Sequence, residues 1–215
     1  KSEIVFRLVP AWYIKTSEIK PKLIECANSV KWEPASNGKR MNDWLTNMGD
    51  WNISRKRYYG MPLPFYPCSC GHITVIGSKA ELRENAVDPA QVDALPELHR
   101  PWVDEVKIKC PHCGKEVSRV SDIGDVWLDA GIVPFSTLDY FTDRESWKKN
   151  FPAEWVTEMH EQVRLWFYSM LFMSTVLVGK APYERVVTNG MVVAEDGSKF
   201  SKTGFMIKFD EAAEK

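Results

Sequence analysis

Four of the five cysteines fall in two close pairs, and these pairs constrain the fold more than any other feature of the sequence. The first pair is Cys68-Ser-Cys70 and the second is Cys110-Pro-His-Cys113, followed by glycine as in a zinc knuckle. A tetrahedral zinc site needs four soft ligands, which paired cysteines on two tight turns supply. We therefore predict a zinc site with these four ligands. Because four protein ligands leave no open coordination position, the metal is expected to be structural.

Two alternatives for the cysteine pairs are disulfides and free thiols. Disulfides are disfavoured because the sequence shows no secretory signal. His72 and His112 lie beside the pairs and are reserve ligands. Cys26 stands alone in an apolar context and is expected to be a buried, inert thiol.

Composition indicates a soluble globular chain of 215 residues, with 44% hydrophobic and 27% charged residues and a net charge of −1. The near-neutral charge means that any RNA contact must use a local basic patch. No apolar run approaches the roughly 18 residues that span a bilayer. We expect no membrane contact and a cytoplasmic location; composition leaves the oligomeric state open.

The first third of the chain predicts an extended stretch, a helix over residues 17–28 with Ser17 as its N-cap, and a second extended stretch in "VKWEP". A second helix is expected where apolar residues recur at helical spacing, namely at Met41, Trp44, Leu45 and Met48. We interpret this stripe as core. The three prolines of "YYGMPLPFYP" favour an edge strand.

The last third alternates strands and helices. "DIGDVWLDAGIVPF" predicts a short strand and a Gly-rich turn, and "FPAEWVTEM" predicts a strand that leads into a helix from about Glu161 to Val178. "YERVVTNGMVVAEDGSK" predicts a strand, a turn and a second short strand, and the final residues begin a helix. This order predicts part of a parallel α/β layer.

The stretch "DGSKFSKTG" (196–204) places two lysines three residues apart among glycines and hydroxyl residues. It is typical of an exposed turn, and also of a mobile clamp for phosphates. Lysine suits a clamp because a point charge on a long stem can follow a moving phosphate.

Five segments in one order resemble class I aminoacyl-tRNA synthetases of the isoleucyl type. "DGSKFSKT" is similar to the family's KMSKS signature. The other four are "DWNISRKRYYGMPLP" (50–64), "LHRPWVDEVKIKCPHCG" (98–114), "DVWLDAGIVPF" (125–135) and "EMHEQVRLWF" (158–167). The Leu-His-Arg-Pro segment points to the isoleucyl member, whereas Pro-Phe-Ser-Thr-Leu leans slightly toward the valyl one.

The resemblance implies a partial Rossmann-like parallel sheet, the C-terminal half of the catalytic domain, with an inserted zinc-ribbon-like module. It implies three parts. Residues 1–66 would return from the editing insertion and start the second catalytic half, 67–121 would be the zinc-binding insertion, and 122–215 would be the second Rossmann half.

In the implied reaction, the carboxylate of a branched aliphatic amino acid attacks the α-phosphate of ATP, which is bound with Mg²⁺, and pyrophosphate leaves. The aminoacyl group then passes to the 3′ end of tRNA. By resemblance, Lys199 and Lys202 meet the charge that develops on the leaving pyrophosphate, and Trp127 and Trp166 wall the amino-acid pocket. The residues implied to bind ATP or the adenylate are Glu158, Glu161, Gln162, Asn189, Gly190 and Ser201.

The sequence also departs from the family. Met159 and Leu165 replace glycines, and Met159 adds bulk where the adenylate is expected. No His-x-Gly-His occurs, so we expect no substantial adenylation by this chain alone. The alternatives are a stand-alone synthetase-like zinc module that contacts RNA or a protein partner without catalysis, a zinc-ribbon structural protein, and a valyl-type fragment.

Overall fold

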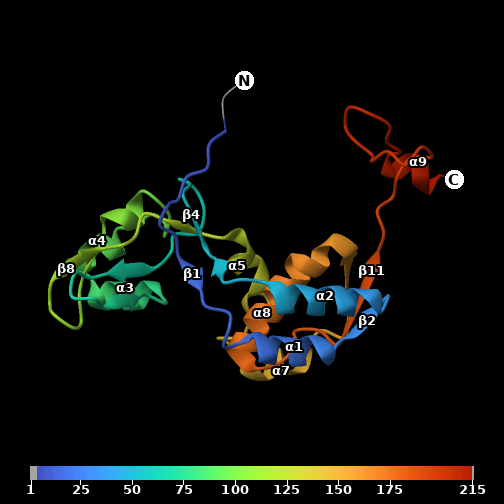
Figure 1. Cartoon of the computed structure of the whole chain (residues 1–215). Coiled ribbons are helices and arrows are strands. Elements are labelled where there is room, and N and C mark those ends of the chain that lie inside the picture. The colour runs from blue at the N-terminus through green and yellow to red at the C-terminus, as the bar shows by residue number, and fades with distance from the viewer. Residues whose placement is uncertain (1–3, 215) are drawn as a thin grey trace. The chain divides into compact units, whose positions relative to one another are not determined.

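The computed structural model describes residues 4–214, which divide into two compact units (Figure 1). The first unit contains the residues up to Pro21 together with Asn47–Val133. The second contains Lys22–Thr46 and the chain from Pro134 onward. Each unit is therefore built from segments that are far apart in the sequence.

The first unit contains four antiparallel strand pairs. They are β1 (Tyr13–Ile14) with β3 (Trp51–Asn52), β4 (Ser54–Arg55) with β9 (Ile123–Gly124), β5 (Phe65–Pro67) with β6 (Ile73–Val75), and β7 (Lys107–Lys109) with β8 (Glu116–Ser118). The strand expected in the proline-rich segment is confirmed as β5, which pairs with β6 in a two-stranded sheet.

Short helices complete the first unit: α3 (Lys79–Asn85), α4 (Pro89–Asp93), the 3-10 helix η1 (Trp102–Glu105) and α5 (Val126–Gly131). Side chains cap three of them, since Ser78 accepts the N–H of Glu81, Asp88 that of Ala90, and Asp125 that of Trp127. The core of this region comprises Tyr66, Cys68, Ile76, Leu82, Ala86, Val92, Val103, Val106, Ile108, Cys110 and Val117. The β5–β6 and β7–β8 hairpins thus share one small hydrophobic core.

The second unit contains a parallel sheet in the order β10–β11–β2, which confirms the predicted parallel α/β layer. Its strands are β10 (Val156–Met159), β11 (Arg185–Asn189) and β2 (Lys31–Glu33). The carboxyl ends of all three strands therefore meet at one edge of the sheet.

The helices of the second unit are α1 (Lys20–Asn28), α2 (Ser36–Asn47), α6 (Val133–Ser136), α7 (Arg144–Asn150), the 3-10 helix η2 (His160–Arg164), α8 (Trp166–Val178) and α9 (Phe209–Ala213). Helix α8 is mostly apolar, carries no charged residue and is largely buried. It ends at Gly179, whose φ of 71° is the left-handed conformation that favours glycine. Among the helices of residues 4–214, none is long and apolar enough to cross a membrane.

Two of the predicted core features are confirmed. Met41 and Leu45 on α2 are fully buried, and Met48 just beyond it is buried as well. Cys26 is buried, with its thiol 3.6 Å from the carbonyl oxygen of Gly179.

Three predicted boundaries are wrong. The first helix begins at Lys20 rather than Ser17. Residues 17–19 form a turn in which the carbonyl of Thr16 accepts the N–H groups of Ile19 and Lys20, but Pro21 has no N–H to continue these bonds at the carbonyl of Ser17. The Gly-rich turn expected after β9 is helical, since Asp125 caps α5 by accepting the N–H of Trp127.

The third boundary is the start of the long apolar helix, which was expected near Glu161. A 3-10 turn, η2, occupies residues 160–164, and α8 begins only at Trp166. Apolar periodicity does not distinguish a 3-10 turn from the first turn of an α-helix.

Candidate metal centre and candidate nucleotide cleft

The four predicted zinc ligands lie on two hairpin loops. In the β5–β6 loop, the N–H of Cys68 donates to the carbonyl of His72, and Gly71 has a φ of 88°. In the β7–β8 loop, the N–H of Cys110 donates to the carbonyl of Lys115, and Gly114 has a φ of 74°. Glycine permits these tight turns because it has no Cβ.

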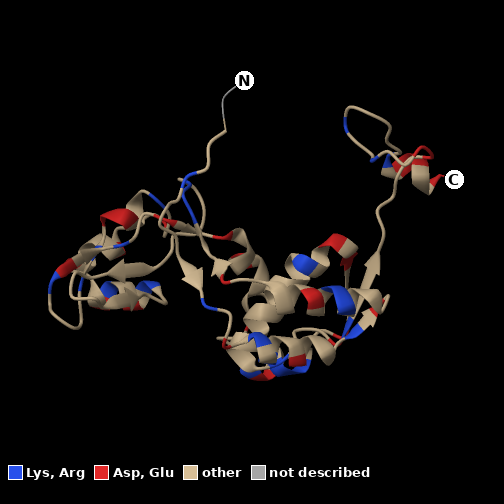
Figure 2. Cartoon of the chain, viewed as in Figure 1, with Lys and Arg blue, Asp and Glu red and all other residues tan. Residues whose placement is uncertain are grey.

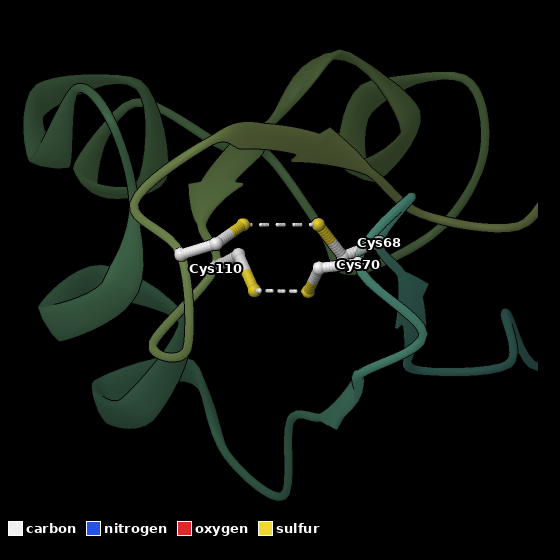
Figure 3. Close-up of side chains that lie close together, drawn as sticks. Cys68, Cys70 and Cys110 are labelled. Atoms are coloured by element: carbon white, nitrogen blue, oxygen red, sulfur yellow. Dashed lines mark hydrogen bonds between the residues drawn. The ribbon is translucent and has the colours of Figure 1, made fainter.

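The sulfur atoms of the two loops face one another (Figure 3). All four ligand atoms lie within 4.8 Å of one another, with Cys68 and Cys113 3.4 Å apart and Cys70 and Cys110 3.8 Å apart. Four sulfurs about 2.3 Å from a tetrahedral zinc would be about 3.8 Å apart. The cluster therefore fits a Cys₄ zinc site. The reserve ligands His72 and His112 stack on each other, with ring centroids 6.0 Å apart, and are not part of the cluster.

Close packing of the thiols affects their protonation. The backbone N–H of Cys70 lowers the pKa of the Cys68 thiol to about 6. The backbone N–H of Lys115 lowers the pKa of Cys113, but contact with Cys68 outweighs it and raises the value to about 12. Four thiolates this close repel one another, so a bound cation would stabilise all of them together.

Asp125 holds two of the family-like segments together within the first unit. Its carboxylate accepts hydrogen bonds from Trp51 Nε1 at 3.1 Å and from Arg55 Nη2 at 2.6 Å. Segments 50–64 and 125–135 are thus joined by a buried carboxylate, although they are distant in the sequence.

A second group of charges links the cysteine-containing region to segment 50–64. The buried guanidinium of Arg119 donates to the carbonyls of Leu63 and Asp122, each at 2.9 Å, and to the Asp104 carboxylate. Asp104 also accepts from Arg100 Nε at 2.6 Å. Partial burial raises the pKa of Asp104, but hydrogen bonds from Arg119 and Arg100 outweigh it and leave the pKa lowered.

In the second unit, a cleft of about 390 Å³ lies at the carboxyl ends of the parallel strands. We name it the strand-end cleft. It is lined by Pro34, Ser36, Asn37, Arg40, His160, Thr188, Asn189 and Gly190. These residues follow or end β2, β10 and β11, and open α/β sheets bind their ligands at this edge. Of the predicted residues, Asn189 and Gly190 line the cleft.

Sequence reasoning missed the contribution of helix α2 to this cleft. Asn37 is buried and its Nδ2 donates to Thr188 Oγ1 at 2.7 Å, which ties α2 to the end of β11. Arg40 lies three residues further along α2, on the same face. The available signal was the position of residues 34–40 directly after a strand.

The residues predicted around the end of β10 make local contacts. Glu158 is the next-to-last residue of β10 and accepts the N–H of Met159 at 3.0 Å. Gln162, in η2, accepts the N–H of Trp166 at 3.2 Å and so caps α8. One carboxylate oxygen of Glu161 is buried without a hydrogen bond, and the other lies 3.6 Å from His160 Nε2.

The lysine segment forms a loop between β11 and α9, and Figure 2 shows basic positions along it. Its first part is a tight turn: Ala194 N–H donates to the carbonyl of Ser198, and Gly197 has a φ of 79°. Lys199, Ser201 and Lys202 are exposed. Within residues 4–214, neither lysine forms an ion pair.

The two predicted pocket tryptophans lie in different units. Trp127 is on α5 in the first unit, and Trp166 begins α8 in the second; both are half-buried. Their shared role in an amino-acid pocket stays a prediction.

Comparisons with a family model and with individual proteins point to the same family. The model of "tRNA synthetases class I (I, L, M and V)" matches residues 1–207. The isoleucine--tRNA ligase of Methanoculleus marisnigri is 42% identical over 94% of this chain, and that of Methanopyrus kandleri is 39% identical over 94%. The isoleucine--tRNA ligase of Methanothermobacter thermautotrophicus is 37% identical over the whole chain.

The chain spans about a fifth of the length of these relatives: 19% for M. marisnigri, 20% for M. kandleri and 21% for M. thermautotrophicus. The family match covers nearly all of the chain, including both hairpin loops, the strand-end cleft and the lysine loop. The chain belongs to the class I tRNA synthetase family that comprises the isoleucyl, leucyl, methionyl and valyl members.

Proposed function

We propose that this chain is the second half of the catalytic domain of an isoleucyl-type aminoacyl-tRNA synthetase. In the full-length protein, it would help to activate a branched aliphatic amino acid with ATP, as the magnesium complex, and to transfer it to tRNA. The observation that carries the proposal is the strand-end cleft at the edge of a parallel sheet, followed in the same unit by a loop with two unpaired, exposed lysines.

The parallel sheet supports a Rossmann-like fold for this unit, because nucleotides bind in clefts at the carboxyl ends of parallel strands. Asn189 and Gly190 would contact the nucleotide from the cleft, and Glu158, Glu161 and Gln162 would contact the adenylate from the end of β10. The unpartnered carboxylate oxygen of Glu161 is free to accept a hydrogen bond from a ligand hydroxyl.

Lys199 and Lys202 would stabilise the charge that develops on pyrophosphate, with Ser201 as a further donor. Their exposed loop suits this role because pyrophosphate must first be surrounded and then released. Trp127 and Trp166 would wall the amino-acid pocket.

Zinc would be held by Cys68, Cys70, Cys110 and Cys113, and its role would be structural because all four positions are filled by protein. We further propose that residues 67–121 form this zinc-ribbon-like insertion, between the segments 1–66 and 122–215. The local core beneath the two hairpins supports a module of this size.

The isoleucyl assignment follows the names of the relatives. A valyl-type fragment is the second candidate, because the pockets for these amino acids differ by one methylene; the handling of this pair by isoleucyl enzymes is a known example of limited discrimination. The non-catalytic alternative is a stand-alone module that contacts RNA or a protein partner. A cytoplasmic location suits each of these roles.

Calorimetric titration of the chain with Mg-ATP tests the proposal. We expect binding that weakens in a Lys202→Ala variant, and no ATP–pyrophosphate exchange above background by this chain alone. Lys208→Ala, a lysine at the N-cap of α9, is the matched control for loss of one positive charge. The proposed nucleotide role is refuted if Mg-ATP does not bind at millimolar concentration to a chain that is folded and loaded with zinc.

A further inference from the structure

The strand-end cleft is lined by an arginine, Arg40, that is not among the predicted site residues. Arg40 and His160 line it from two different elements, α2 and η2, and among the described residues no Asp or Glu lines it. Arg40 is half-buried, and its guanidinium has no ion pair or hydrogen bond in the described part of the chain. A partly desolvated guanidinium without a counter-charge favours an anionic ligand.

The acidic side chains on either side of Arg40 in the sequence do not line the cleft. Asp43, three residues along α2, is exposed and is not among the lining residues. Glu33, at the end of β2, forms ion pairs with Lys31 at 2.9 Å and with Arg185 at 3.7 Å. Glu161 lies 3.6 Å from His160 and is not among the lining residues. The cleft therefore keeps a net basic character on the α2 side.

The position of Arg40 is also fixed. Because Asn37 is buried and bonded to Thr188, the first turns of α2 are held against the end of β11. Arg40 lies one turn further along the same helix face. Because its backbone is already held in place, only the side chain of Arg40 loses conformational freedom when it binds a ligand. A guanidinium offers a planar fork of donors that matches two phosphate oxygens at once.

We propose that Arg40 is a substrate-binding residue that contacts a phosphate group of the nucleotide in the strand-end cleft, with His160 as a second donor. This inference rests on the proposed function, since it assumes that the ligand at the strand ends is a nucleotide. It adds helix α2 to the site, on the opposite side of β11 from β10.

The test is calorimetric titration of the zinc-loaded chain with inorganic pyrophosphate, AMP and Mg-ATP. Arg40→Ala is expected to weaken binding of the phosphate-bearing ligands about tenfold or more, and Arg40→Lys to weaken it less, because lysine keeps the charge and loses the fork. Lys39→Ala is the matched control: this exposed neighbour on α2 carries the same charge and does not line the cleft. Its dissociation constants should stay within about twofold of those of the unmodified chain.

The two proposals fail in different ways. If Lys202→Ala weakens Mg-ATP binding while Arg40→Ala has no more effect than Lys39→Ala, the nucleotide function stands and the role of Arg40 is overturned. If Arg40→Ala weakens pyrophosphate binding and Lys202→Ala has no effect, Arg40 binds phosphate and the proposed role of the lysine loop is wrong.

A third arm identifies the source of the phosphate. A short single-stranded RNA is titrated in place of ATP. If Arg40→Ala weakens RNA binding but leaves AMP, pyrophosphate and Mg-ATP unchanged, the proposal is overturned in favour of an RNA contact. Circular dichroism of each variant confirms that the fold is retained.

Discussion

Replacing Arg119 with methionine should destabilise the first unit strongly, because the side chain is a buried charge with several partners. Its exposed fraction is 1%, and it donates to two backbone carbonyls and to the Asp104 carboxylate. Methionine fills similar space without any donor, so the carbonyls of Leu63 and Asp122 would lose their partner. Asp104 would keep only Arg100.

The magnitude follows from these contacts. Each buried carbonyl left without a donor costs about 1–3 kcal/mol, and breaking a buried ion pair by removing one partner costs about 3–5 kcal/mol in total. Because Asp104 retains one arginine and is partly exposed, we expect a loss of about 3 kcal/mol rather than the upper end of that range.

Urea unfolding of the zinc-loaded chain, followed by circular dichroism, measures this loss. Arg83→Met is the matched control, since Arg83 pairs with Asp93 at 2.9 Å but both side chains are 55% exposed. An exposed pair of this kind contributes at most about 1 kcal/mol. If Arg119→Met costs no more than Arg83→Met, the reasoning about the buried network is wrong.

Further outcomes follow from the same structure. Cys110→Ser should lower the bound zinc, measured by metal analysis, well below one per chain, whereas Cys26→Ser should leave it unchanged, because Cys26 lies outside the cluster. Leu171→Ala, at a fully buried position of α8, should cost about 2–5 kcal/mol in urea unfolding, and an exposed Val176→Ala on the same helix much less. The pKa of Asp104 is lowered from its ordinary value of 3.8 by folding. Its ionised form therefore stabilises the folded chain at pH values above 3.8, and this stabilisation is lost as the pH falls through the lowered pKa. Asp104→Asn should therefore flatten the pH dependence of stability in that range, and an unchanged slope would contradict this.

Local chemistry made the cysteine cluster and the parallel layer predictable. The spacing of Cys68, Cys70, Cys110 and Cys113 in two close pairs is typical of ligands on tight turns, and the structure brings the four sulfur atoms together. The order of strand, helix and strand in "FPAEWVTEM" to "YERVV" predicted a parallel layer, which the structure confirms as β10 and β11. The extended stretch "VKWEP" supplies the third strand, β2, whose place in this sheet was not predicted.

Features that depend on tertiary context were not predictable. Sequence alone gave no signal that Asn37 would bond to Thr188, because the two side chains meet only when β2 and β11 pair. The start of α8 at Trp166 depends on Gln162, whose side chain caps the helix from a preceding 3-10 turn. Likewise, the α5 helix depends on Asp125, which is positioned by Trp51 and Arg55 from a distant segment.

The central claim is that this chain supplies one half of an isoleucyl-type active site. A chimera in which it replaces the corresponding fifth of the M. marisnigri isoleucine--tRNA ligase tests the claim most directly. We predict isoleucine-dependent ATP–pyrophosphate exchange by the chimera, which Lys202→Ala reduces strongly. A folded, zinc-loaded chimera that shows no exchange with isoleucine or valine, while the parent ligase is active in the same assay, would contradict the account.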